Sequence, residues 1–217
     1  MGYYVEVNNV TKVIGGHPIL NNIELKLKEG KIYGFKGKNG SGKTMLLRLV
    51  CGLIKPSSGE VIVNGKRIGE CFPESVGLLI EYPGFLPYYT GFQNLKLLAS
   101  IQGKIDDTKI YNILNQVGLD PKDKRRFKKY SLGMKQRLGI AQAVMEDPEF
   151  IVLDEPTNAL DTDAVQMVRE LLLNMKSKGK TILIASHDQE ELNVLCDEIY
   201  TIDNGKIIGH KVNLVTN

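Results

Sequence analysis

The stretch GKNGSGKT, residues 37 to 44, decides the fold of this chain. It follows the run KIYGFK, which is typical of a strand, and precedes the apolar run MLLRLVCGL, which is typical of a helix. Its glycines let the backbone turn tightly and point N–H groups at an anion, and the start of the helix adds a positive dipole end. The pattern G-x-x-x-x-G-K-[ST] in this strand-to-helix context predicts a cradle for nucleotide phosphates.

Two residues at the end of the cradle have specific predicted roles. Lys43 supplies a point charge for the β and γ phosphates, and the hydroxyl of Thr44 is placed to bind Mg²⁺. The predicted nucleotide-binding residues of the cradle are Gly37, Lys38, Asn39, Gly40, Ser41, Gly42, Lys43 and Thr44. The expected ligands are a nucleoside triphosphate and Mg²⁺.

Two carboxylates follow a second apolar run, FIVLDEP from residue 150. Asp154 is the expected partner of Mg²⁺. Glu155 lies one residue further along and points differently, so it is predicted to orient the attacking water or act as general base. The alternative, a pair of acids at a helix start, is disfavoured because a run that is apolar on both faces is a costly place for charge without a cation.

A histidine follows the next apolar run, TILIAS from residue 181. Neighbouring parallel strands end at the same edge of a sheet, so His187 is predicted to reach the γ-phosphate and to hold the water and Glu155. A lone histidine is often purely structural. The position of His187, after the strand that follows Glu155, favours the functional interpretation.

The rest of the chain predicts an α/β fold. Short alternating runs between residues 3 and 36 and a hairpin at Asn64-Gly65 indicate an N-terminal antiparallel β lobe. Apolar spacing predicts helices from about 92 to 146 and another from 161 to 178, the latter with Asp161 as its N-cap. That helix lies between two buried runs, which predicts a βαβ unit and a mainly parallel sheet.

Composition sets limits on the function. The net charge of +3 does not by itself indicate nucleic acid, and no nucleic-acid partner is expected. No stretch reaches the roughly 18 apolar residues that span a bilayer, so any membrane role is expected to come through a partner. Cys51, Cys71 and Cys196 are odd in number and without metal-ligand spacing, so they are predicted to be reduced thiols.

These motifs together resemble the ABC ATPase family over essentially the whole chain. Residues 37–44 and 150–155 are similar to its Walker A and Walker B motifs, SLGMKQR from Ser131 to its signature loop, and NALD to its D-loop, which ends at Asp161. The resemblance implies ATP as the nucleotide and a head-to-tail dimer, either a homodimer or a pseudo-dimer with a second ATPase subunit. The residues expected to contact the ATP of the partner are Ser131, Leu132, Gly133, Met134 and Lys135.

The signature loop also has a physical interpretation independent of the family. Ser131 offers a hydroxyl and Gly133 a bare N–H at a helix start, which makes a second anion site in the same chain. A simple helix cap is the alternative. Because one chain has two phosphate-binding helix starts, we favour the interpretation that each supplies half of a composite site formed between two subunits.

The resemblance also implies a domain organisation. The predicted fold is a P-loop NTPase core with a mainly parallel sheet, an N-terminal antiparallel β lobe and an inserted helical subdomain, all in one domain of residues 1–217. The core and β lobe are expected at about 1–80 and 148–217. The helical subdomain, which carries the signature loop, is expected at about 82–147.

Three features depart from the family pattern. Leu132 and Met134 replace a small residue and a glycine of the signature loop, although Met134 retains a backbone N–H. Glu81 replaces the glutamine expected after the strand VGLLI and is predicted to bind Mg²⁺ as an anionic ligand; the alternative is a surface acid. Ile14 replaces the aromatic residue that packs on adenine, which predicts weak discrimination between ATP and GTP.

The expected function is an ATP hydrolase that powers a membrane permease from the cytoplasmic face of the membrane. The segments IEYPGFLPYYTGFQNLKLLA and SLGMKQRLGIA resemble the bacitracin and lantibiotic drug-export subfamily, which implies export of a drug, peptide or lipid-like compound. The loop from Glu81 to residue 92, dense in aromatic residues, is the expected permease contact, with local packing as the alternative. A soluble ATPase acting on nucleic acid, ribosomes or assemblies, and a P-loop kinase, are the competing functions.

Overall fold

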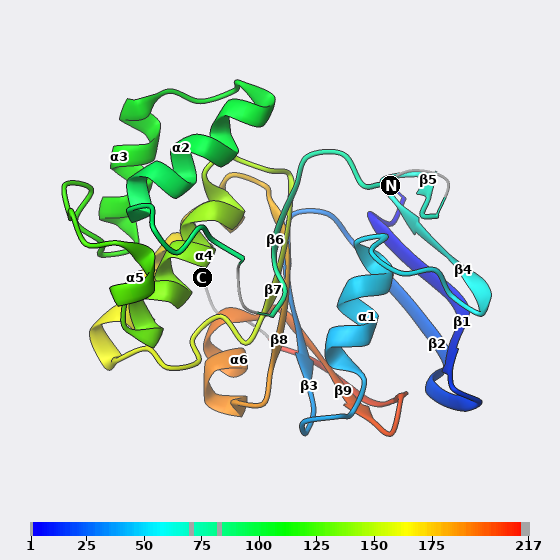
Figure 1. Ribbon diagram of the computed structural model, residues 1–217. Coiled ribbons are helices and arrows are strands. Elements are labelled where there is room, and N and C mark those ends of the chain that lie inside the picture. The colour runs from blue at the N-terminus through cyan, green and yellow to red at the C-terminus, as the bar shows by residue number, and fades with distance from the viewer. Residues whose placement is uncertain (1, 70–71, 82–83, 214–217) are drawn as a thin grey trace.

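The computed structural model describes residues 2–69, 72–81 and 84–213, and the predicted thiol Cys71 lies outside these ranges. Two β-sheets and a set of helices form the described chain (Figure 1). The strands are β1 (Val5–Ile14), β2 (His17–Leu27), β3 (Ile32–Lys36), β4 (Ser58–Val63), β5 (Lys66–Arg67), β6 (Val76–Leu79), β7 (Phe150–Asp154), β8 (Thr181–Ser186), β9 (Glu198–Asp203) and β10 (Lys206–Val212). The α-helices are α1 (Lys43–Val50), α2 (Gly91–Gln102), α3 (Asp107–Gln116), α4 (Leu132–Val144), α5 (Thr162–Ser177) and α6 (Gln189–Leu195).

The smaller sheet is antiparallel, with the strand order β2-β1-β4-β5. Its strands alternate buried and exposed residues, as in β2, where Ile23, Leu25 and Leu27 are buried. The β4–β5 hairpin turns at Asn64 and Gly65, which have φ angles of 48° and 71°, as a tight two-residue hairpin turn requires. The predicted β lobe is confirmed.

The larger sheet has the order β10-β9-β3-β8-β7-β6 and is parallel except for its edge strand β10. Every residue of β7 and β8 is buried. Successive residues of β7 alternate between two cores: Ile151 and Leu153 pack on the helical side, and Phe150 and Val152 pack toward the other sheet. This two-sided burial explains why these runs show no polar alternation in the sequence.

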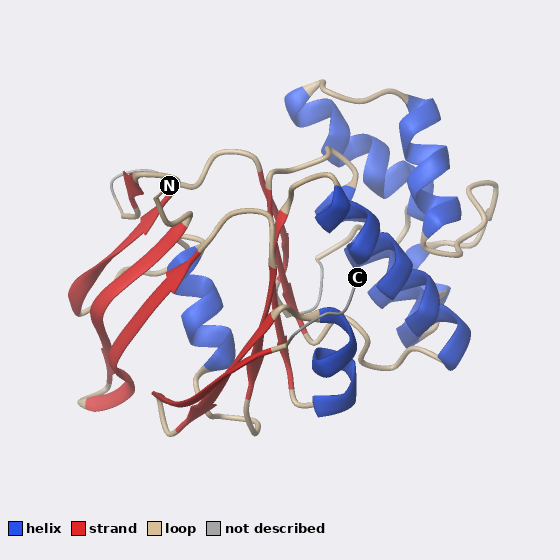
Figure 2. Cartoon of the chain, turned by 180° about the vertical axis from the view of Figure 1, so that it is seen from behind, coloured by secondary structure: helices blue, strands red, loops and turns tan. Residues whose placement is uncertain are grey.

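Helices cover the larger sheet on both faces. Helix α1 lies between the two sheets, and α4, α5 and α6 lie on the opposite face together with α2 and α3 (Figures 1 and 2). Helix α5 connects β7 to β8, which run parallel, so the predicted βαβ unit is present. Asp161 caps α5, since its side chain accepts a hydrogen bond from the N–H of Ala164 at 2.8 Å.

The predicted α/β fold is confirmed, and the helical segment has three separate α-helices. A turn at residues 103–106 divides α2 from α3, and residues 117–131 contain turns and a short 3₁₀ helix at Phe127–Lys129. Cys51 and Cys196 are free, buried thiols, and burial raises the pKa of Cys51 to about 12. None of the helices among residues 2–69, 72–81 and 84–213 has the length and apolar content to cross a bilayer.

The register of the parallel strands determines where the site lies. Lys36 at the end of β3 is paired with Ser186 at the end of β8, and Asp154 at the end of β7 is paired with Ala185. The residues that follow these strands therefore meet at one edge of the sheet. Those residues are the phosphate cradle, Glu155 and His187.

Candidate active site

The cradle connects β3 to α1, and two of its glycines have no room for a side chain. Gly42 is the N-cap of α1 with φ of 110°, and a β-carbon there would lie 2.8 Å from Leu20 Cδ2. A β-carbon on Gly37 would lie 2.4 Å from the carbonyl oxygen of Ile202. The loop packs closely on β2 and β9, so a side chain at either position would displace the cradle.

Lys43 lies inside the loop with only 6% of its surface exposed. Its Nζ donates to the carbonyl oxygens of Gly37 at 2.7 Å and Lys38 at 3.3 Å, and lies 3.6 Å from Glu155 Oε1. The ammonium group thus closes the loop and places a positive charge beside a cavity of about 360 Å³. The cavity is lined by Ile19, residues 38–45, Asp154 and Glu155.

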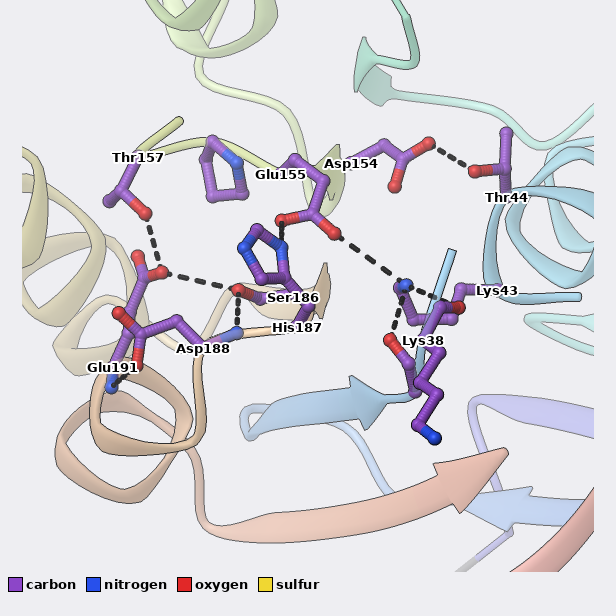
Figure 3. A network of polar contacts seen from close by, with 12 residues as sticks. Lys38, Lys43, Thr44, Asp154, Glu155, Thr157, Ser186, His187, Asp188 and Glu191 are labelled. Carbon is purple, nitrogen blue, oxygen red and sulfur yellow. Dashed lines mark hydrogen bonds and ion pairs between the residues drawn. The ribbon is translucent and has the colours of Figure 1, made fainter. Parts of the chain in front are cut away.

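Thr44 and Asp154 meet at one wall of this cavity. The hydroxyl of Thr44 donates to Asp154 Oδ2 at 2.6 Å, and Asp154 Oδ1 is buried without a hydrogen-bond partner in the described chain (Figure 3). Burial raises the pKa of Asp154, and the charges of Glu155 and Glu81 raise it further. A buried carboxylate with an unused oxygen next to a hydroxyl is a donor set that suits a hard divalent cation.

Glu155 and His187 form a pair beside Lys43. His187 Nδ1 lies 2.8 Å from Glu155 Oε2, and Figure 3 shows the carboxylate of Glu155 between the imidazole of His187 and the ammonium of Lys43. Glu155 has φ of 48°, a conformation that is uncommon outside glycine. Its N–H is held by the carbonyl oxygen of Ala185 at 2.8 Å. The side chains predicted to orient water and sense the γ-phosphate are thus in direct contact.

Sequence reasoning missed three residues in or near the site. Gln136 on α4 is buried, and its Nε2 donates to the carbonyl oxygens of Glu155 at 2.9 Å and Pro156 at 3.2 Å. Ile19, and not Ile14, lines the cavity. Arg48 on α1 forms an ion pair with Glu81. The only sequence signal for Gln136 is its place one turn into the helix that follows Ser131.

The signature-loop residues lie outside the cavity lined by the cradle of their own chain. Ser131 is the N-cap of α4, and its hydroxyl accepts a hydrogen bond from the N–H of Met134 at 3.2 Å. The N–H of Met134, expected to remain available for a phosphate, is therefore engaged within the helix cap. Gly133 is close to the D-loop, because a β-carbon there would lie 2.9 Å from the carbonyl oxygen of Ala159. The ammonium of Lys135 lies 5.5 Å from the ring centre of Phe127.

Three predicted residues border other parts of the molecule. Leu132 is half-exposed and, with Glu81, lines a smaller cavity of about 130 Å³ that also reaches Asp154 and Glu155. Ile14 is half-exposed at the end of β1, so its contact with the base stays a prediction.

A strand–loop–helix phosphate cradle beside a strand that ends in two carboxylates defines a P-loop nucleotide-binding protein. Residues 20–158 match the family model described as ABC transporter, so this chain belongs to the ABC transporter family, as an ATP-binding subunit that hydrolyses ATP.

The named relatives below are all transport or transporter ATP-binding proteins. The chain is 44% identical over 205 residues to the uncharacterized ABC transporter ATP-binding protein YybJ of Bacillus subtilis (strain 168), covering 94% of each chain. It is 38% identical over 207 residues to the lantibiotic transport ATP-binding protein SrtF of Streptococcus pyogenes, covering 95% of this chain and 90% of SrtF. It is 38% identical over 212 residues to the bacitracin transport ATP-binding protein BcrA of Bacillus licheniformis, covering 96% of this chain and 69% of BcrA. The resemblance stated from the motifs is confirmed.

Solved structures confirm the fold. The cbiO1 subunit of the cbiONQ ABC transporter complex from Clostridium perfringens is 27% identical, with a TM-score of 0.81 and coverage of 98% and 89%. The ATP-binding cassette MJ0796 bound to ADP and Pi is 24% identical, with a TM-score of 0.88 and coverage of 96% and 98%. At that identity, the likeness to MJ0796 concerns the fold.

Proposed function

We propose that two copies of this chain, or this chain and a second ATPase subunit, close around ATP and power a membrane permease. The contact between Glu155 and His187 beside the Lys43 cradle carries this proposal. Glu155 orients the attacking water, His187 contacts the γ-phosphate, and Lys43 neutralises phosphate charge. Catalysis of this kind depends on positioning and electrostatic stabilisation, which fixed loops at one sheet edge supply.

Thr44 and Asp154 would hold Mg²⁺. Among the described residues no group of three or more His, Cys, Asp or Glu side chains forms a metal site. Phosphate oxygens would supply further ligands. Bound there, the cation would neutralise charge on the β and γ phosphates. Glu81 is proposed as a third ligand, in which case its carboxylate has to release Arg48.

The metal role of Glu81 can be tested by removing its charge and its oxygens separately. Glu81→Ala is expected to raise the Mg²⁺ concentration for half-maximal ATP hydrolysis by about fivefold or more, because a carboxylate ligand is lost. Glu81→Gln keeps one oxygen and is expected to change the Mg²⁺ concentration for half-maximal ATP hydrolysis by less than about twofold. Mg²⁺ titrations at saturating ATP measure both. An unchanged titration for Glu81→Ala would leave the ion pair with Arg48 as the role of Glu81.

The dimer follows from the second phosphate-binding helix start. Residues 131–135 lie at the exposed start of α4, outside the cavity of their own chain, where a second copy in a head-to-tail arrangement presents its nucleotide. The Ser131 hydroxyl and the α4 dipole would then contact the ATP of the partner. We propose the same domain organisation as the sequence predicts. The core with its β lobe comprises about residues 1–80 and 148–217, and the helical subdomain about residues 82–147.

The permease contact is proposed at the segment between β6 and α2. Leu86, Tyr88 and Tyr89 are exposed there, and the Lys128 ammonium lies 4.5 Å from the ring centre of Tyr88. Several exposed apolar side chains so close together often mark a protein contact. The predicted contact residues Tyr82 and Pro83 lie outside the described residues.

Co-purification tests the transport function. If a neighbouring reading frame encodes a multi-span membrane protein, that protein, expressed with this chain, is expected to purify with the wild type. It is expected to be lost with Leu86→Asp combined with Tyr88→Ala, while ATP binding is retained. Val212→Asp, an exposed residue of β10, is the matched control. Equal recovery in all three chains would refute this contact surface, and no recovery with the wild type would favour the soluble alternative.

We propose export as the direction of transport. SrtF and BcrA are named for lantibiotic and bacitracin transport, and we propose a drug, peptide or lipid-like substrate for this chain as well. The chain would act at the cytoplasmic face of the membrane. A soluble ATPase working on nucleic acid or ribosomes remains the second candidate function, and the co-purification result separates the two.

A further inference from the structure

Glu191 on α6 is a buried carboxylate that the site described so far does not use. Only 1% of its surface is exposed, and within the described chain Asp154 is the other buried carboxylate. A carboxylate removed from water is costly unless hydrogen bonds or opposite charges compensate it. Its contacts therefore indicate what its position contributes.

One oxygen of Glu191 connects two loops. The hydroxyl of Thr157 donates to Glu191 Oε2 at 2.5 Å, and the hydroxyl of Ser186 donates to the same oxygen at 3.4 Å. The Ser186 oxygen also accepts a hydrogen bond from the N–H of Asp188 at 3.0 Å. Figure 3 shows Glu191 between the loop that follows β7 and the loop that follows β8.

These two loops carry the catalytic pair. Thr157 is two residues beyond Glu155, and Ser186 directly precedes His187. Glu155 has an unfavourable positive φ, so its backbone needs external support to keep this conformation. A hydroxyl–carboxylate–hydroxyl link next to both residues fixes the spacing of the loops and thereby the 2.8 Å contact of His187 with Glu155.

Charges of both signs surround Glu191. Burial raises the pKa of Glu191, and so does the negative charge of Asp188, while the Thr157 hydrogen bond and the positive charge of Arg169 lower it. Glu191 Oε1 and Arg169 Nε are both buried without a hydrogen-bond partner in the described chain. Helix α5, which carries Arg169, thus supplies the nearby positive charge.

We propose that Glu191 is a positioning residue for ATP hydrolysis: it ties Thr157 to Ser186 and so holds Glu155 and His187 at hydrogen-bond distance. The inference rests on the proposed roles of Glu155 and His187. Glu191 is not among the residues that line the cradle cavity, so in this proposal it acts through the two loops.

Glu191→Ala is expected to lower kcat by about 10- to 100-fold with the KM for ATP changed by less than about twofold, because a small misplacement of reacting groups costs this much. Glu191→Gln, whose amide oxygen still accepts from Thr157, is expected to keep kcat within about threefold. Glu190→Ala, a neighbouring exposed residue of α6, is the matched control and is expected to resemble the wild type. Steady-state ATPase assays and thermal unfolding are measured for each.

A double-mutant cycle separates positioning from general stabilisation. In a His187→Ala background, Glu191→Ala is expected to lower kcat by less than about twofold further, because the pair it positions is already broken. If Glu191→Ala does not fold, Thr157→Val, which removes one hydroxyl of the link and keeps the shape, replaces it in the same cycle. Equal losses of kcat in both backgrounds, or a Glu191→Gln variant as impaired as Glu191→Ala, would overturn the proposal.

The single variants distinguish a failure of the proposed role of His187 from a failure of the positioning role of Glu191. Full turnover in His187→Ala alone would refute the proposed role of His187, whatever Glu191 does. Reduced turnover in His187→Ala with wild-type turnover in Glu191→Ala would refute only the positioning role.

Discussion

The Glu155→Gln variant is expected to bind ATP as tightly as the wild type and to hydrolyse it about 100- to 1,000-fold more slowly. The amide keeps the shape of the side chain and its contact with His187 but cannot accept a proton or orient water as a carboxylate does. Since Glu155 Oε1 lies 3.6 Å from Lys43, the change also removes one negative charge that would repel the phosphates, so ATP binding is expected to be retained. Calorimetric ATP titration and a phosphate-release assay measure the two effects.

Glu170→Gln is the control for this experiment, because Glu170 is an exposed carboxylate of α5 remote from the cavity. It is expected to leave both binding and turnover unchanged. Undiminished hydrolysis in Glu155→Gln would remove the role assigned to Glu155. A parallel loss of binding would indicate that the carboxylate supports the cradle itself.

The Ser131→Arg variant is expected to lose ATP-driven dimerisation while each chain still binds one nucleotide. A bulky side chain at the start of α4 would occupy the position where the ATP of the partner is expected, and the cradle on β3 and α1 is untouched. The assay is light scattering or sedimentation with ATP and Mg²⁺ in a Glu155→Gln background, which slows loss of the nucleotide. A stable ATP dimer in this variant would refute the composite site.

Ser131→Ala separates the helix cap from the dimer contact. The Ser131 hydroxyl caps α4 by accepting from Met134, so its loss is expected to lower stability by about 0.5–2 kcal/mol without adding bulk at the interface. Gly133→Asp is a less specific test. A β-carbon at Gly133 would lie 2.9 Å from the Ala159 carbonyl oxygen, so that variant also disturbs the D-loop of its own chain.

The features that the sequence predicts well are local or lie at strand ends. The cradle, Asp154, Glu155 and His187 each follow directly from a buried strand, and parallel strands bring their ends together without any further information. The Asp161 cap and the Asn64-Gly65 turn depend on neighbouring residues alone. Such features need no knowledge of side-chain packing.

The features that the sequence does not predict depend on contacts between distant segments. Gln136 reaches Glu155 across 19 positions and Glu191 reaches Thr157 across 34, and in each case the side chain would look like an ordinary helix residue. The ion pair of Arg48 with Glu81 gives an alternative partner to a carboxylate predicted from the sequence to bind metal. Likewise, Ile19 and not Ile14 lines the cavity, and the pairing of β1 with β2 contains register shifts that the sequence pattern does not reveal.

Calorimetric titration of the purified chain with ATP in the presence of Mg²⁺ tests the central claim most directly, with Lys43→Ala as the comparison. The account predicts one nucleotide bound per chain, with uptake lost or strongly weakened in Lys43→Ala because that ammonium closes the cradle and faces the cavity. Absence of nucleotide uptake by the wild-type chain, also when its membrane partner is present, would contradict it.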